Sequence, residues 1–119
     1  MKTADWLFHY KALVTAVYDG DTITVDIDLG LKIAVRGEKI RLHRINAPEV
    51  RGAEKEAGKV SRDFLRSRIL GKEILIETIK DKKGKYGRYL AEIWLEENSS
   101  YININDELVE TGHAEYKDY

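Results

Sequence analysis

Two short segments of the chain carry oxygen-bearing side chains of the kind that bind hard cations. Asp19 and Asp21 flank a glycine, and Asn46 and Glu49 flank an Ala-Pro pair further along the chain. Carboxylate and amide oxygens are typical ligands of calcium and similar divalent ions. Asp19 and Asp21 are equally typical of a plain turn, because Asp accepts turn conformations and Gly accepts a positive φ. On these residues alone, a cation site and a simple turn both remain open.

The composition fits one domain and excludes several classes of protein. The 119 residues are 43% hydrophobic and 34% charged, with 20 Lys and Arg against 21 Asp and Glu. This balance is neither disordered nor membrane-like, and it excludes nucleic-acid binding through bulk charge alone. The absence of cysteine excludes disulfides, thiol nucleophiles and Cys-bound zinc. No apolar run typical of a secretory signal is visible, so we expect a single domain over residues 1–119, monomeric and cytoplasmic by default.

Three segments in the first half of the chain alternate apolar and polar residues with the period of a β-strand. They cover positions 8–18, 23–29 and 39–45, and in the first of them the even-numbered residues are expected on the buried face. Asp19-Gly20 predicts a turn between the first two strands, and Gly37-Glu38 predicts the turn before the third.

After Pro48 the apolar period becomes helical, in a stripe made of Ala57, Val60, Phe64, Leu65 and Ile69. Gly71 is placed to end this helix, and Asn103 to cap a short last helix that ends at Gly112. Between them, residues 73–79 and 88–95 have β-type composition and are joined by a polar turn over residues 81–85. The order favours an α+β, mainly β fold: a five-stranded OB-type barrel with one helix between strands 3 and 4 and a short C-terminal helix. A plain α+β sandwich would have a similar pattern.

The expected hairpins bring the oxygen ligands together. The third strand runs in the same direction as the first, so the residues that follow these two strands lie at the same edge of the barrel. Asp19 and Asp21 are therefore expected close to Asn46 and Glu49. Sequence direction alone thus predicts an oxygen-rich site suited to a hard cation.

Three motifs, in this order, resemble the staphylococcal nuclease (thermonuclease) family. They are Val-Tyr-Asp-Gly-Asp-Thr at 17–22, Arg-Leu-His-Arg-Ile-Asn-Ala-Pro-Glu at 41–49 and Lys-Tyr-Gly-Arg at 85–88. The segment 105–112 is similar to the second helix of that family, and the resemblance covers roughly positions 10 to 116. It implies an OB barrel that carries a calcium-dependent phosphodiesterase acting on DNA and RNA with little sequence preference.

The resemblance also implies a role for nine residues. The metal ligands would be Asp21, Asn46 and the Ala47 carbonyl, and Glu49 would be the general base. Arg41 and Arg88 would contact the scissile phosphate. Lys85 and Tyr86 would contact the substrate further along, and Tyr116 lies near the position of the base-stacking tyrosines of the family.

These residue types suit phosphodiester hydrolysis on chemical grounds as well. Guanidinium groups stay charged and can bind two phosphate oxygens at once. A divalent ion neutralises another oxygen and orients the attacking water, and a nearby carboxylate accepts the proton of that water. Carboxylates beside a phosphate would repel it unless a cation lay between them. This favours a metal-using enzyme over a simple binding protein.

Asn46 departs from the family pattern, which has an aspartate at this position. An amide oxygen can bind calcium, but the loss of a negative charge weakens the affinity. Weaker calcium binding, preference for another divalent ion and loss of activity all remain open. The sequence predicts a nuclease with a divalent cation, expected to be calcium, as cofactor and with DNA, RNA or both as partner. The alternatives are a non-catalytic OB-fold nucleic-acid-binding module and a protein-interaction domain.

Overall fold

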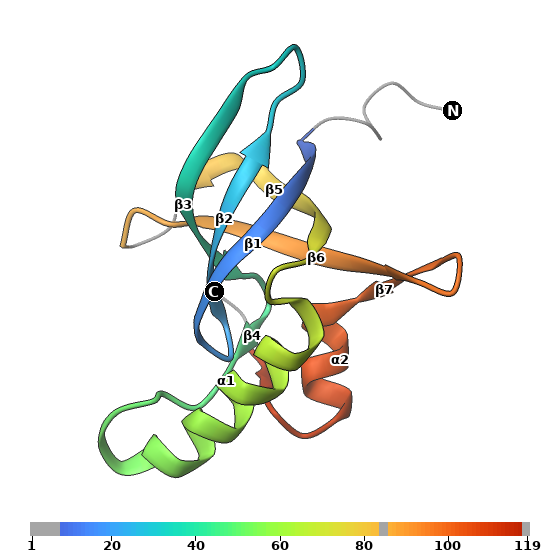
Figure 1. Ribbon diagram of the computed structural model, residues 1–119. Helices are drawn as coiled ribbons and strands as arrows, with labels where there is room; N and C mark the ends of the chain where they lie inside the picture. The colour runs from blue at the N-terminus through green and yellow to red at the C-terminus, as the bar shows by residue number, and fades with distance from the viewer. Residues whose placement is uncertain (1–7, 84–85, 118–119) are drawn as a thin grey trace.

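The computed structural model describes residues 8–83 and 86–117. In chain order its elements are β1 (His9–Asp19), β2 (Thr22–Asp28), β3 (Ala34–Leu42), β4 (Ile45–Asn46), the 3-10 helix η2 (Gly52–Glu54), α1 (Lys55–Ile69), β5 (Glu73–Lys83), β6 (Tyr89–Glu97), β7 (Ser100–Asn103), α2 (Ile104–Glu110) and β8 (Glu115–Tyr116) (Figure 1).

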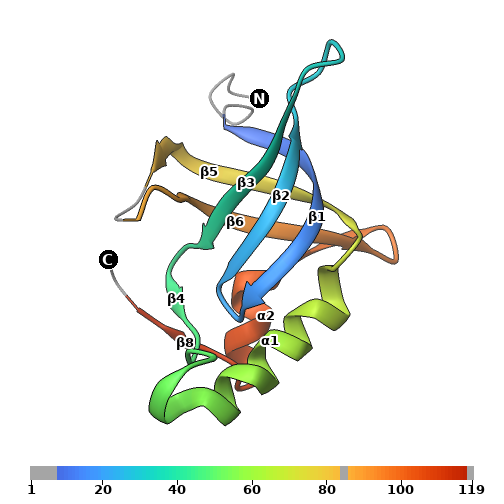
Figure 2. The ribbon, with the colours of Figure 1, turned by 60° about the vertical axis from the view of Figure 1, so that its left-hand side comes forward.

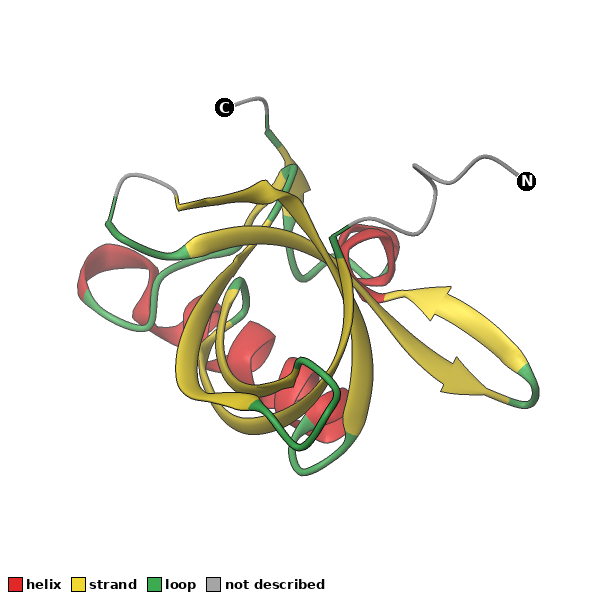
Figure 3. Cartoon of the chain, turned by 90° about the horizontal axis from the view of Figure 1, so that it is seen from above, coloured by secondary structure: helices red, strands yellow, loops and turns green. Residues whose placement is uncertain are grey.

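Five strands close into a barrel. β1 pairs antiparallel with β2 and β5, β2 with β3, and β5 with β6, while a parallel pairing of β3 with β6 completes the ring (Figure 3). Both helices lie at one end of this barrel (Figures 1 and 2). The predicted mainly β α+β fold of OB type is confirmed. No helix in the described part of the chain is long and apolar enough to cross a membrane.

Aliphatic side chains fill the barrel and its helical end. Ile23, Ile40 and Ile93 from three different strands are fully buried, and Leu65 of α1 and Leu108 of α2 close the core where the helices lie. Branched side chains of this size fill the interior of a small barrel without leaving a channel. The core therefore fixes the strand ends from which the polar site is built.

The alternation expected for the first strand is wrong in its second half. Val14 pairs with Val25 and Ala16 with Thr24, so β1 contains an extra residue there. Such a β-bulge reverses the faces of the residues that follow. The side chain of Val17 is consequently buried, whereas Tyr18, expected inside, is 52% exposed.

The turn between β2 and β3 lies at residues 29–33 and not at Gly37-Glu38. The Leu29 amide donates to the Ile33 carbonyl (2.9 Å), which closes the hairpin. Gly37 has a φ of 68° inside β3, at a break in the register with β2, and its amide donates to Asp26 Oδ1 (2.9 Å). The conformational freedom of this glycine serves a bulge instead of a turn.

Two further boundaries differ from the sequence prediction. The third strand ends at Leu42, because the chain turns at residues 43–44, where Arg44 has a φ of 67°. β5 continues to Lys83, so the first three residues of the turn predicted at 81–85 belong to a strand. The remaining two, 84–85, lie outside the described residues.

α1 packs through a different stripe in its N-terminal half. Gly58, Ser61, Leu65 and Ile69 are buried, whereas Val60 is 60% exposed. A helix that approaches its neighbours this closely buries small residues, so the predicted inner positions of Ala57 and Val60 are wrong.

The predicted helix ends are confirmed. Gly71 follows α1 with a φ of 76°, as expected of a residue that ends a helix in the left-handed conformation. At the start of α2 the Asn103 side chain accepts a hydrogen bond from the Asp106 amide (2.9 Å). Gly112 follows this helix with a φ of 81°.

Candidate active site

A pocket of about 820 Å³ opens at the edge of the barrel where β1 and β3 end. Seven of the nine predicted site residues line it: Asp21, Arg41, Asn46, Ala47, Glu49, Tyr86 and Arg88. Lys85 lies outside the described residues, and Tyr116 is not among the lining residues. The expected convergence of the two loops is therefore present in the structure.

The β1–β2 turn places two buried carboxylates in this pocket. Asp19 is 9% and Asp21 6% exposed. The Asp21 amide donates to Asp19 Oδ1 (3.1 Å), and the Thr22 hydroxyl donates to Asp21 Oδ1 (3.1 Å). Asp19 thus forms an Asx-type turn, as the plain-turn interpretation expects, and both carboxylates nevertheless line the pocket.

Asp21 also ties the turn to the segment after β4. The Ala47 amide donates to Asp21 Oδ2 (2.8 Å) in the interior. Gly20 permits this approach, because a Cβ at this position would lie 2.8 Å from the Cβ atoms of both Ala47 and Ser61. The glycine between the two aspartates is therefore required by packing.

Arg41 links the two oxygen-bearing segments from the third strand. Its guanidinium is fixed by bonds to the carbonyls of Leu42 (2.7 Å) and Ile45 (3.1 Å). Nη2 then lies 3.3 Å from Asp21 Oδ2 and 3.4 Å from Asn46 Oδ1. One buried guanidinium nitrogen thus bridges a carboxylate and an amide that the sequence predicted as metal ligands.

Arg88 also lines the pocket. Its Nη1 donates to the Thr22 hydroxyl (3.2 Å), and its guanidinium carbon lies 5.1 Å from the centre of the Tyr86 ring. Its Nε is buried and has no hydrogen-bond partner among the described residues. A buried N–H without an acceptor is costly, and a phosphate oxygen in the pocket is an acceptor that would satisfy it.

Burial and repulsion act on the aspartate pair. The pKa of Asp19 is raised to about 7, first by burial and then by the hydrogen bond and negative charge of Asp21. A cation beside the pair would offset both effects. Among the described residues, no three Asp, Glu or His side chains lie close enough together to bind a metal. Asp19, Asp21 and Asn46 nevertheless line the same pocket, and their carboxylate and amide oxygens are donors of the kind that hard divalent cations prefer.

Glu49 lies at the exposed rim of the pocket, and α1 fixes its backbone. A Cβ built on Gly58 of that helix would overlap the Glu49 carbonyl and approach the Val50 amide to 2.7 Å. The helix and the Glu49 segment are thus in backbone contact, which only glycine permits at position 58.

The lining residues that the sequence analysis did not single out include Tyr18, Arg51 and Lys117. The β1 bulge turns Tyr18 outward, and the Lys117 amide donates to the Arg44 carbonyl (2.8 Å) beside the β4–β8 pairing. Neither a bulge nor a two-residue ladder between distant segments has a sequence signal. Arg51, three residues after Pro48, could have been noted from its position.

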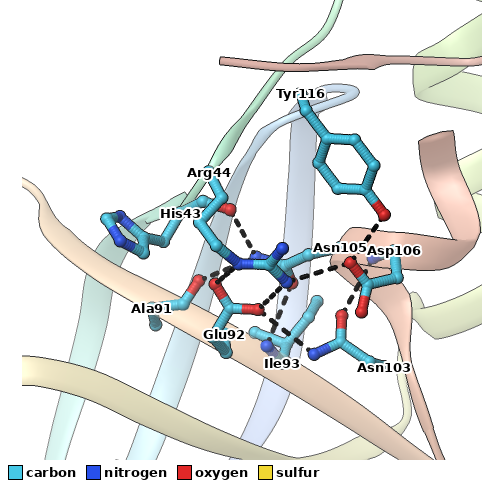
Figure 4. Close-up of polar contacts among 9 residues, drawn as sticks. All are labelled: His43, Arg44, Ala91, Glu92, Ile93, Asn103, Asn105, Asp106 and Tyr116. Atoms are coloured by element: carbon cyan, nitrogen blue, oxygen red, sulfur yellow. Dashed lines mark hydrogen bonds and ion pairs between the residues drawn. The ribbon is translucent and has the colours of Figure 1, made fainter. Parts of the chain in front are cut away.

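Tyr116 takes part in a polar cluster outside the pocket (Figure 4). Its hydroxyl donates to Asp106 Oδ1 (2.9 Å), which raises the pKa of the tyrosine, and its ring lies 5.7 Å from the guanidinium carbon of Arg44. Arg44 in turn donates to both Glu92 oxygens (2.9 and 2.6 Å) and to Asp106 (3.0 Å). The structure thus does not bring Tyr116 together with the other predicted substrate contacts.

Asn105 fixes the backbone beneath this cluster. Its side-chain amide donates to the carbonyls of His43 (2.9 Å) and Ala91 (3.1 Å), and its Oδ1 accepts from the Ile93 amide (3.0 Å) (Figure 4). The Asn105 side chain is fully buried between α2 and β6. They hold the turn after Arg41 in place, and hence one wall of the pocket.

Comparison with known proteins gives concordant matches. The family model described as staphylococcal nuclease homologue matches residues 39–119. The thermonuclease of Staphylococcus intermedius is 31% identical over 110 residues, which are 90% of this chain and 60% of that protein. The thermonuclease of Staphylococcus hyicus is 30% identical over 109 residues, covering 89% of this chain and 59% of that protein.

An archaeal relative matches to a similar degree. An uncharacterized protein of Methanocaldococcus jannaschii is 31% identical over 129 residues, covering 89% of this chain and 58% of that protein. The chain therefore spans about three fifths of the length of the curated relatives it matches.

Proposed function

Because this chain belongs to the staphylococcal nuclease family, we propose that it is a metal-dependent nuclease that hydrolyses phosphodiester bonds of DNA, RNA or both with low sequence specificity. One observation carries the proposal: Asp19 and Asp21 share a pocket with two arginines, and the buried Nε of Arg88 lacks an acceptor among the described residues. Anionic and cationic groups that line one pocket suit a phosphate bound beside a cation.

The cation would be held by Asp21, Asn46 and the backbone carbonyl of Ala47, and we expect it to be calcium. When bound, such an ion neutralises a phosphate oxygen and polarises the attacking water. A bound cation would keep the Asp19 carboxylate ionised despite its raised pKa. The negative charge of Asp19 would then compensate in part for the neutral side chain at position 46.

The two arginines would bind the phosphate and stabilise the charge that develops on it. Arg41 is held by two backbone carbonyls, so its guanidinium is already oriented before substrate binds. Arg88 would give its Nε–H to a phosphate oxygen. Losing one such preorganised donor typically costs about 10²–10³ in rate.

Glu49 would act as the general base. The oxygen of water attacks phosphorus and one of its protons passes to the Glu49 carboxylate. The bond from phosphorus to the leaving oxygen breaks, and this oxygen takes up a proton from solvent to become the hydroxyl of the product. The position of Glu49 at the open rim of the pocket gives water access to this carboxylate. Lys85 and Tyr86 are proposed to contact a further phosphate of the bound strand.

Chelator-sensitive digestion tests the proposal. Plasmid DNA and RNA are incubated with the protein and calcium, and then with calcium and excess chelator. We expect cleavage in the first case and none in the second. Binding without chelator-sensitive cleavage would support the non-catalytic module instead. Absence of any nucleic-acid affinity at low salt, where phosphate contacts are strongest, would support a protein-interaction domain.

A further inference from the structure

A second hollow, of about 600 Å³, adjoins the candidate active site along the outer side of β1 and α1. We call it the basic groove, and five basic side chains line it: Lys39, Arg51, Arg62, Arg66 and Arg88. No Asp or Glu is among its lining residues. The chain as a whole has 20 basic and 21 acidic residues, so the groove is a local separation of charge and not the consequence of a basic protein.

The basic groove is continuous with the candidate active site. Tyr18, Thr22, Arg51 and Arg88 line both hollows. The bond from Arg88 Nη1 to the Thr22 hydroxyl (3.2 Å) lies at this junction. A polyanion with one phosphate between Arg41 and Arg88 can therefore place its neighbouring phosphates in the groove.

Hydrogen bonds and weak pairing leave the α1 arginines available to an anion. Arg66 donates through Nε (3.3 Å) and Nη2 (3.1 Å) to the Val17 carbonyl, which fixes it against β1 while its charge stays unpaired in that contact. Asp63 lies 3.1 Å from Arg62 Nε and 3.9 Å from Arg66 Nη1, and its side chain is 63% exposed. An ion pair this exposed contributes little free energy, so a phosphate can compete with Asp63 for both guanidinium groups.

Tyr18 indicates which form of polyanion the groove suits. Its ring is 52% exposed at the junction of the two hollows, because the β1 bulge turns it out of the core. An exposed aromatic face beside a line of cations is the combination that binds single strands, where unpaired bases can stack. A duplex keeps the faces of its bases inside the stack.

We propose that the basic groove binds a single-stranded nucleic acid, its cations contacting successive phosphates on one side of the cleaved bond and Tyr18 stacking on a base. This inference rests on the proposed function, since it takes nucleic acid as the ligand of the adjoining pocket. It adds a strand path that starts at Arg88 and follows Lys39, Arg62 and Arg66.

The test removes one cation from each wall of the groove. Lys39→Gln/Arg62→Gln changes an exposed position of β3 and a partly buried position of α1, and it leaves the Arg66 contact to Val17 intact. Lys32→Gln/Arg36→Gln is the matched control, because it removes the same charge from two residues that line neither hollow. They belong to the β2–β3 hairpin, whose tip lies far from the β1–β2 turn (Figure 1). Thermal unfolding checks that both variants fold.

Binding of a 20-nucleotide single-stranded DNA is measured by fluorescence anisotropy with chelator, over a series of salt concentrations. Each phosphate neutralised on a single strand contributes about 0.7 to the slope of log Kd on log salt. The groove variant should therefore lose about 1.4 of slope and bind about 25-fold more weakly at 0.1 M salt. We expect Tyr18→Leu to weaken binding at least about fivefold, and Tyr18→Phe to restore it.

Cleavage kinetics distinguish an effect on the groove from an effect on the active site. With calcium, the groove variant should raise KM for the oligonucleotide and leave hydrolysis of a mononucleotide p-nitrophenyl ester unchanged, since that substrate is too short to reach the groove.

The failures of the two proposals differ. If the wild-type protein binds the oligonucleotide but does not cut it, the proposed nuclease activity is wrong and the proposed groove stands. A wild-type protein that cuts, while the groove variant matches the control in slope and KM, overturns the groove and leaves the nuclease. No binding at 20 mM salt with chelator overturns the groove, and an equal loss of affinity for a matched duplex overturns its assignment to single strands.

Discussion

Arg41 contacts the same two side chains that are proposed to hold the cation. Its Nη2 lies 3.3 Å from Asp21 Oδ2 and 3.4 Å from Asn46 Oδ1. A bound divalent ion and the guanidinium therefore share the negative charge of these oxygens. An aspartate at position 46 would add a second carboxylate beside the divalent ion and the Arg41 guanidinium. With asparagine there, the ion and the guanidinium share the aspartates of the β1–β2 turn.

Replacing Asn46 by Asp should accordingly strengthen calcium binding. The added charge would lie at a partly buried position that shares the Arg41 nitrogen with Asp21, so we expect the dissociation constant to fall roughly tenfold. Isothermal titration calorimetry with calcium measures it, and Asn98→Asp, at an exposed turn, is the control for added charge alone. An unchanged affinity would show that Asn46 does not bind the cation.

Glu49→Gln isolates the proton acceptor, because glutamine keeps the shape of glutamate and cannot take up the proton of water. We expect kcat to fall by about 10²–10⁴ while calcium affinity stays the same. Glu54→Gln changes an exposed carboxylate of η2 that does not line the pocket and should keep the wild-type rate. Single-turnover cleavage of a labelled oligonucleotide gives both rates. Cleavage by Glu49→Gln at the wild-type rate would eliminate this residue as the base.

At the scale of elements, the packing of α1 sets the position of Glu49. Alanine is a better helix former than glycine by about 1 kcal/mol, yet a Cβ at position 58 would overlap the Glu49 carbonyl. We therefore expect Gly58→Ala to lower the free energy of unfolding by about 1–3 kcal/mol and to reduce kcat, since the backbone of Glu49 must move. Urea unfolding and the cleavage assay measure the two effects.

Val60→Ala is the control for this helix, because it changes an exposed position two residues away. It should leave both the stability and the rate nearly unchanged. A Gly58→Ala protein as stable and as active as the wild type would show that α1 does not position Glu49.

The elements that the sequence predicts well are those with a local cause. The Asp19-Gly20 turn, the end of α1 at Gly71 and the Asn103 cap each depend on a few neighbouring residues, and all three are present. The convergence of Asp21 with Asn46 also follows from local features, because strand direction alone places both at one edge.

The features that the sequence analysis missed depend on contacts between distant segments or on residues without a turn signal. Leu31 and Lys32 adopt positive φ values of 55° and 66° in the β2–β3 turn, a conformation that their residue types do not indicate. The extra residue in β1 is revealed only by its pairing with β2, and it decides that Tyr18 faces outward. The sequence therefore predicted that seven of the motif residues would come together in one pocket, and it did not predict the basic groove beside them.

At the scale of the whole molecule, Arg68 joins the two helices and the barrel. From α1 it reaches Glu107 of α2 (Nε to Oε1, 2.6 Å) and Glu97 at the end of β6 (Nη1 to Oε2, 2.9 Å). The cluster of Arg44, Glu92 and Asp106 makes a second connection, between the turn after β3, β6 and α2 (Figure 4). These contacts hold the helical end of the barrel, against which the Glu49 segment packs.

The Arg68 contact should make stability depend on pH in the acid range. Its hydrogen bonds lower the pKa of Glu97 below the ordinary value of 4.5. The folded protein then binds fewer protons than the unfolded chain near that pH, so the contribution of Glu97 is present above pH 4.5 and is lost as the pH falls through the folded-state value.

In Arg68→Gln the pKa of Glu97 returns toward 4.5, so we expect lower stability than wild type at pH 6 and a difference that shrinks toward pH 3. Urea unfolding from pH 3 to 6 measures it, with Arg36→Gln as the control, since the Arg36 side chain is 82% exposed on the β2–β3 hairpin. A difference between wild type and Arg68→Gln that stays constant over this range would show that Glu97 is not the group responsible.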